Sequence, residues 1–160
     1  MQTFLPYADF DRSAAALDSR RLGKQRVETL QVMQVLLGLR WDNDRATIQA
    51  YEPKGWRTHP VVLMWRGYEA ALGDYQRAVC TAWRGLGFRD TCETKTTGLL
   101  AESGRPLAVV LPPWLGDPAL HASHRSNLVR KDPDVYGPLF PGVDADLPYL
   151  WPVAPPTPPR

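Results

Sequence analysis

The sequence contains little cysteine and none of the long apolar segments that place a protein in a membrane. Cys80 and Cys92 are its only cysteines, too few for a disulfide framework, and they form no CxxC motif. No apolar run approaches the roughly eighteen residues that a membrane-spanning helix needs. The first ten residues lack the charged and apolar regions of a signal peptide. We therefore expect a cytoplasmic protein with reduced thiols and no membrane partner.

Familiar catalytic and metal-binding motifs are absent as well. The 160 residues contain no glycine-rich phosphate loop, no GxSxG sequence and no cysteine–histidine nucleophile signature. His121 and His124 have the spacing of two ligands on one helix, but no third ligand follows at a recognisable distance. We expect no metal and no organic cofactor. A chain of this length without internal repeats is expected to form one monomeric domain, residues 1–152, followed by an extended proline-rich tail, residues 153–160.

Positive charge is concentrated in two segments, although the net charge of the chain is only +2. Residues 12–26 carry five cations and one anion, and residues 118–131 carry three cations, two histidines and no anion. The rest of the chain is therefore acidic. If the fold brings the two basic segments together, they form one basic surface, which is typical of proteins that bind a phosphate backbone.

The sequence predicts helices in three regions, of which one shows clear three-and-four spacing of apolar residues and another opens on an N-cap and proline at Asp117 and Pro118. The clearest region is residues 61–86, where Thr58 or His59 is suited to cap the start and the glycines of "GLG" are suited to end it. A basic helix is expected from about residue 13 to residue 39, and a third helix over residues 118–131. Three main helices without a convincing strand indicate an all-α fold.

The segments between and after these helices are expected to be irregular. Residues 40–60 are predicted to form a connection with room for one short helix. Residues 88–117 contain turn residues and one apolar run that is too interrupted by proline to predict a sheet. From residue 132 onward the chain is rich in proline and aromatic residues, so we expect it to wrap the surface, held by its rings, with residues 154–160 extended and mobile.

Glu28 occupies an unusual position on the first predicted helix. On a helical wheel it falls on a stripe with Leu17 and Arg21 on one side and Val32 on the other. One interpretation is an ion pair with Lys24 at i, i+4 spacing, which stabilises a helix by only a few tenths of a kcal/mol. The other interpretation is a carboxylate kept for chemistry, where an apolar stripe meets a basic rim.

Side chains that suit phosphate contacts occur in both basic segments. An alternative explanation is that both segments are solvated helix faces, the second with cations placed favourably near a helix C-terminus. Of the six tryptophans, most are expected in the core, and one or two exposed rings could stack on a base. The candidates are Arg20, Arg21, Lys24 and Arg26 in the first segment, and His124, Arg125, Asn127, Arg130 and Lys131 in the second.

Several motifs together resemble the pyrimidine dimer DNA glycosylase (endonuclease V-like) family. They are "RLGKQRVE" at residues 21–28, "HP" at residues 59–60, "GFRDT" at residues 87–91, and "SHRSNL" at residues 123–128. The resemblance covers most of residues 1–137. It implies an all-helical DNA repair glycosylase that acts on damaged bases in double-stranded DNA, with AP-lyase activity as a further expectation.

The resemblance also implies a mechanism and a set of site residues. In the family, the α-amine of the chain attacks C1′ of the damaged nucleotide, displaces the base and leaves a Schiff base, and β-elimination then cleaves the strand. An α-amine titrates near pH 8 and lysine near pH 10.4, approximately, so a useful fraction of the α-amine is neutral at pH 7. By position, the resemblance assigns catalysis to Met1 and Glu28. It assigns phosphate contacts to Arg21, Lys24 and Arg26, and to the later region of His124, Arg125, Asn127 and Lys131. We add Arg20, Arg130 and His59 to the expected DNA contacts, although a helix cap is the favoured role of His59.

One departure from the family leaves the identity of the nucleophile open. Gln2 is too large for ordinary removal of the initiator methionine, so the free amine belongs to Met1, and the basic residue that follows the nucleophile in the family is replaced by Gln2 or Thr3. The protein could instead be a monofunctional glycosylase, use Lys24 as nucleophile, or act on another lesion. The sequence is also compatible with a non-catalytic nucleic-acid-binding module, with an enzyme acting on a free nucleotide, and with a helical interaction protein whose first cations point away from residues 124–131.

Overall fold

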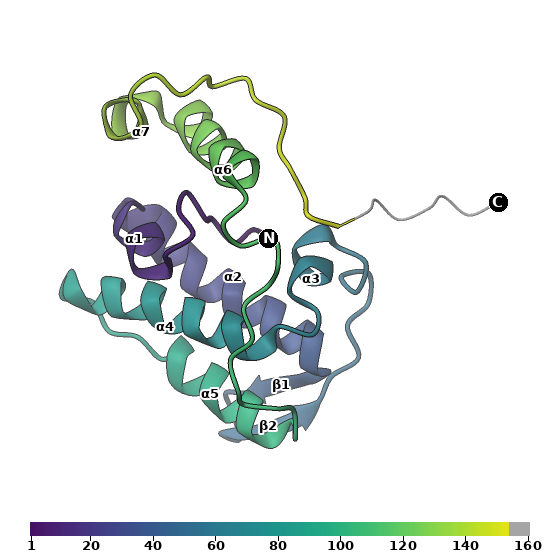
Figure 1. Ribbon diagram of the computed structural model, residues 1–160. Coiled ribbons are helices and arrows are strands. Elements are labelled where there is room, and N and C mark those ends of the chain that lie inside the picture. The colour runs from purple at the N-terminus through teal and green to yellow at the C-terminus, as the bar shows by residue number, and fades with distance from the viewer. Residues whose placement is uncertain (154–160) are drawn as a thin grey trace.

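The computed structural model describes residues 1–153, so the predicted extended tail at 153–160 lies outside the described residues except for Val153. Within that range the chain forms seven helices and one antiparallel pair of strands (Figure 1). The fold is predominantly helical, as predicted, but the predicted number of three main helices is too low. The elements are α1 (Phe10–Ala15), α2 (Ser19–Leu37), β1 (Leu39–Asp42), β2 (Thr47–Ala50), α3 (Pro60–Trp65), α4 (Glu69–Gly85), α5 (Cys92–Glu102), α6 (Pro118–Lys131) and α7 (Pro133–Leu139).

Two predicted helices are each divided by a short break. The predicted helix at 13–39 is replaced by α1 and α2, because Asp18 adopts an extended backbone and its side chain accepts a hydrogen bond from the Arg21 amide, which starts a new helix. The predicted helix at 61–86 is replaced by α3 and α4, separated at Gly67, whose φ of +84° is left-handed. Apolar periodicity continues across both breaks, so it could not reveal them.

The predicted connection at residues 40–60 contains a β-hairpin instead of a short helix. Trp41 pairs with Ile48 across the two strands, and the carboxylate of Asp42 accepts hydrogen bonds from the Asp44 and Arg45 amides in the turn. Trp41 and Ile48 both approach Gly98 of α5, so the hairpin packs one face on that helix. Alternation of apolar and polar residues at 39–42 was the signal that the prediction missed.

Of the three remaining helices, α6 was predicted, whereas α5 and α7 were not. Helix α5 lies in the predicted irregular segment 88–117, and α7 lies in the segment after residue 132 that was predicted to wrap the surface. Helix α6 has the expected bounds, and the Asp117 carboxylate accepts a hydrogen bond from the Ala119 amide at its start. None of the helices in the described residues is long and apolar enough to cross a membrane.

The N-terminal arm, residues 1–7, is enclosed by the rest of the fold. In Figure 1 it passes between α6 on one side and α2, α3 and α4 on the other. The largest buried side chains, including Trp65, Tyr75 and Tyr136, belong to the core around it. After α7 the chain returns to α3, where Tyr149 packs on Trp151 with ring centroids 4.9 Å apart. The Tyr149 ring also lies 4.9 Å from that of His124 and the Trp151 ring 6.0 Å from that of His59, so the segment wraps the surface and its rings hold it there.

Candidate active site

A buried glutamine on α2 fixes the beginning of the N-terminal arm. The Gln25 side-chain oxygen accepts a hydrogen bond from the Phe4 amide over 3.0 Å, and its nitrogen donates to the Gln2 carbonyl over 2.5 Å. Trp65 donates from its indole nitrogen to the Thr3 hydroxyl over 3.0 Å. Because Gln25 is 1% exposed, water does not compete for these bonds. The residues that follow Met1 are therefore held in one conformation.

Helix α6 fixes the next residues of the arm from the opposite side. The Leu5 amide donates to Nδ1 of His124 over 2.9 Å, and Nδ1 of His121 donates to the Leu5 carbonyl over 2.8 Å. Arg125 donates to the Pro6 carbonyl over 2.6 Å. His124 is fully buried, and burial, reinforced by His121, lowers its pKa to about 3. It is therefore neutral at pH 7, as an acceptor at Nδ1 requires.

The arm, the start of α2 and the end of α6 together line a cleft of about 530 Å³. Part of the lining comes from residues 20–28 and part from residues 127–131, so the fold brings the two basic segments together. A helical interaction protein was expected to have its first cations pointing away from residues 124–131. Instead, Arg20, Arg21 and Lys24 line the same cleft as Asn127 and Lys131. The lining residues are Met1, Gln2, Phe4, Arg20, Arg21, Lys24, Gln25, Glu28, Asn127 and Lys131.

Glu28 lies in this cleft beside the predicted partner Lys24. The Lys24 ammonium is 3.6 Å from the Glu28 carboxylate, and the lysine side chain is 75% exposed, whereas the glutamate side chain is 15% exposed. An ion pair of that length with one solvated partner contributes little to stability. The pair therefore exists, but it leaves a sheltered carboxylate facing the same space as Met1.

Arg21 is engaged by carboxylates at the edge of the cleft. Its guanidinium lies 2.6 Å from Asp18 and 3.4 Å from Asp132, which precedes α7. Asp18 also accepts a hydrogen bond from the Tyr136 hydroxyl. Burial alone would raise the pKa of Asp18, but hydrogen bonds from Tyr136 and Arg21 lower it below its usual value. Arg21 thus ties the start of α2 to α7, while Arg20, Lys24 and Lys131 are exposed cations of the cleft.

His59 lies close enough to the cleft to be influenced by its charged groups. Nδ1 of His59 accepts a hydrogen bond from the Val61 amide over 3.2 Å, so it caps α3 as predicted. Its ring is 5.2 Å from Trp56 and 6.0 Å from Trp151. Burial and the Met1 amine lower the pKa of His59, and Glu28 partly opposes them.

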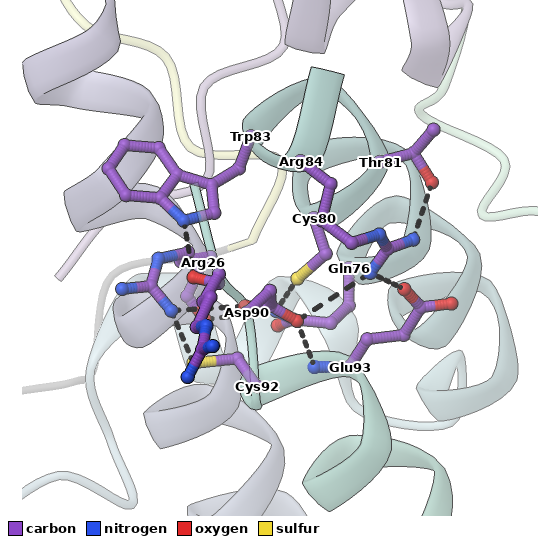
Figure 2. A network of polar contacts seen from close by, with 10 residues as sticks. Arg26, Gln76, Cys80, Thr81, Trp83, Arg84, Asp90, Cys92 and Glu93 are labelled. Carbon is purple, nitrogen blue, oxygen red and sulfur yellow. Dashed lines mark hydrogen bonds and ion pairs between the residues drawn. The ribbon is translucent and has the colours of Figure 1, made fainter. Parts of the chain in front are cut away.

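Besides His59, four of the predicted DNA-contacting residues lie outside the cleft lining and bond to other parts of the protein. His124 and Arg125 hold the arm. Arg130 donates to the carbonyls of Ala145 and Leu147 and so fastens the segment after α7. Arg26 bonds to Asp90, which is buried between α2, α4 and α5 (Figure 2).

The prediction overlooked Gln25, although it stands inside the "RLGKQRVE" motif. A neutral amide carries no charge signal, and its role depends on the arm, which only the fold brings close to α2. Among residues 1–153, no group of three or more histidine, cysteine or acidic side chains is placed to hold a metal ion.

Comparison with known proteins supplies a family for this site. The family model for pyrimidine dimer DNA glycosylase matches residues 1–96, which include Met1, Glu28 and the first basic segment. No curated protein and no solved structure matches the chain. Because the family match covers more than half of the 160 residues, the chain belongs to the pyrimidine dimer DNA glycosylase family, a family of DNA repair enzymes.

Proposed function

We propose that this protein removes damaged bases from duplex DNA with the α-amine of Met1 as nucleophile and then cleaves the strand. The observation that carries the proposal is that Met1 and Glu28 line one cleft together with cations from two distant segments. The hydrogen bonds of Gln25 and His124 to the arm support it, because an amine on an anchored arm is already positioned for attack.

The reaction then follows from an amine and a carboxylate in one cleft. The amine nitrogen attacks C1′, and the bond from C1′ to the base breaks, with its electron pair leaving on the base, which takes up a proton. Opening of the sugar breaks the C1′–O4′ bond, O4′ takes up a proton, and an imine forms between Met1 and C1′. Loss of a C2′ proton expels the 3′ phosphate by breaking the C3′–O bond. Hydrolysis of the imine returns the free amine.

Glu28 is the group we assign to charge stabilisation and proton transfer. Positive charge develops at C1′ as the base leaves, and a sheltered carboxylate stabilises it more strongly than one in bulk water would. The same carboxylate is suited to accept the C2′ proton during elimination. Its 15% exposure supports this assignment over that of a solvated surface charge.

The remaining lining suits a distorted DNA strand. Arg20, Lys24 and Lys131 are cations for phosphate contacts, and Asn127 adds neutral hydrogen bonding. Enzymes that act on a base extrude the nucleotide from the stack, which costs least at a damaged site. The volume of about 530 Å³ provides room for an extruded nucleotide.

Borohydride trapping on a panel of lesion-bearing and abasic duplexes tests the amine chemistry. Borohydride reduces an imine to a stable amine, so we expect a covalent protein–DNA adduct, and peptide mapping should place it on Met1. An adduct on Lys24 would move the nucleophile to that residue. No adduct with any duplex would contradict strand cleavage through a Schiff base.

Substitution of the carboxylate separates catalysis from binding. Glu28→Gln keeps the shape of the side chain, so we expect duplex affinity within about twofold of the wild type and turnover reduced by at least about a hundredfold. Glu52→Gln is the matched control, because Glu52 is 86% exposed and outside the cleft. Equal turnover of the Glu28→Gln variant and the wild type would contradict the catalytic assignment.

A further inference from the structure

A second feature of the molecule is a stack of three flat groups on α2, α4 and the loop after α4. The Arg26 guanidinium lies 4.8 Å from the Trp83 ring, and Phe88 stacks on Trp83 with centroids 4.2 Å apart and planes inclined by 20°. The stack ends at Phe88, which is 48% exposed. An aromatic ring that is stacked behind and open in front is the arrangement on which nucleobases stack.

A polar network around the buried Asp90 side chain fixes the groups next to the stack (Figure 2). Trp83 donates from its indole nitrogen to the Arg89 carbonyl over 2.8 Å. Asp90, with a side chain 1% exposed, lies 3.0 Å from Arg26 and accepts a hydrogen bond from the Glu93 amide. The loop is thus fastened directly after Phe88. A prepositioned ring loses little conformational entropy when a ligand binds.

Gly23 allows the stack to reach α2. A Cβ atom at residue 23 would stand 2.8 Å from the Trp83 ring, closer than such atoms approach in proteins. The absence of a side chain therefore seats the tryptophan directly on α2, whose other side lines the cleft. This is a specific use of glycine for close approach, within the "RLGKQRVE" motif.

The stack and the cleft flank one exposed ridge of α2. At about 100° per residue, Glu28 and Arg26 lie on nearly opposite sides of the helix, and Arg20, Lys24 and Val27 lie between them. These three residues are exposed. A helix is about 10 Å wide, so a duplex laid across this cationic ridge reaches both sides. The exposed cation Arg89, next to Phe88, extends the basic surface in that direction.

We propose that Phe88, backed by Trp83, stacks on a nucleobase of the DNA beside the lesion while the damaged nucleotide occupies the cleft. This inference rests on the proposed function, because it takes the occupant of the ridge to be DNA. It assigns the stacking contact to the phenylalanine, with the tryptophan as its support.

Fluorescence of 2-aminopurine tests the contact directly. The probe is a set of duplexes with a tetrahydrofuran site, which cannot form a Schiff base, and with 2-aminopurine at successive positions in both strands. We expect wild-type protein to quench one position strongly, and Phe88→Leu to abolish that quenching and weaken binding about tenfold. Phe88→Trp should restore both. No difference between wild type and Phe88→Leu at any position would overturn the proposal.

Leu86→Ala is the matched control. Leu86 is 53% exposed on the same loop but is aliphatic and cannot stack on a base, so its removal should leave affinity and quenching unchanged. An equal loss with Leu86→Ala would indicate general apolar contact and overturn stacking. Adduct formation by the wild type on a natural abasic duplex reports the proposed function separately. Dependence of binding on Phe88 without any adduct would support the stack and remove the amine chemistry.

Discussion

His124 accepts a hydrogen bond at Nδ1 from the amide of Leu5, over 2.9 Å and across 119 positions of sequence. Together with the bonds of His121 and Arg125, it joins the arm that carries Met1 to the helix that carries Lys131. Its other ring nitrogen is 3.0 Å from the hydroxyl of Tyr149, in the segment after α7. His124 is therefore the point at which the start, the late helix and the final described segment of the chain meet.

The position of His124 predicts acid sensitivity. Its folded-state pKa of about 3 lies below the ordinary value of 6.5, so the unfolded chain takes up the proton first. Stability is fully present above pH 6.5 and is lost as pH falls toward 3, by about 1.4 kcal/mol per pH unit within that window. We expect the free energy of unfolding, measured with urea at pH 7, 5.5 and 4.5, to fall less steeply in His124→Gln. Parallel pH profiles for the two proteins would contradict this.

Gln25 is predicted to position the amine without touching DNA. Gln25→Leu removes both bonds to the arm and should lower the rate of borohydride-trapped adduct formation at least tenfold, because Met1 loses its fixed geometry. Duplex affinity should change by less than about threefold. Gln31→Leu, on the exposed side of the same helix, is the control and should trap at the wild-type rate. If Gln25→Leu lost as much duplex affinity as it lost in the rate of adduct formation, Gln25 would be assigned to DNA binding instead.

The cleft cations are predicted to set the salt dependence of DNA binding. Arg20→Ala and Lys131→Ala should each reduce the slope of log K against log salt by about one, because each removes one phosphate contact. Arg45→Ala is the control, since Arg45 is 75% exposed in the hairpin turn. Fluorescence anisotropy between 50 and 300 mM salt, approximately, measures the slope. An unchanged slope in both cleft variants would place the duplex elsewhere.

Asp90 is predicted to matter for stability more than any surface carboxylate. It lies 3.0 Å from Arg26 and 3.8 Å from Arg84, and its side chain is 1% exposed. Asp90→Ala leaves these cations without their buried partner and should lower the free energy of unfolding by about 2–4 kcal/mol in urea titrations. Asp74→Asn breaks a pair with the 63%-exposed Arg77 and should cost less than about 1 kcal/mol. Similar losses in the two variants would contradict the assignment.

Both cysteines lie in the polar network around Asp90, which residue type alone did not reveal. Burial raises the pKa of Cys80 to about 12 and also raises that of Cys92. Both thiols are therefore poor nucleophiles and act as small buried side chains. Figure 2 places them next to Asp90, where Arg26 also lies. The sequence indicated only that Arg26 is one of the cations of the first basic segment, and gave no sign of its buried partner.

The main features of the site could be predicted from local sequence. The cap of α3 by His59 and the bounds of α6 depend on neighbouring residues, so spacing and capping rules were sufficient. The predicted stripe of Glu28 holds for Arg21 and Val32 on α2 but not for Leu17, which precedes that helix. The breaks at Asp18 and Gly67 were missed because apolar spacing continues across them. The hairpin was missed because each of its strands is only four residues long.

The sequence by itself determined that the protein is helical, that its positive charge gathers in two segments, and that one glutamate stands where a basic rim meets an apolar stripe. Only the tertiary structure decided which cations face the cleft and which, like Arg26, are taken by buried carboxylates. It also decided that the arm before α1 is held by Gln25 and His124. The physical reason is that a buried polar group needs a partner, and that partner can lie anywhere along the chain.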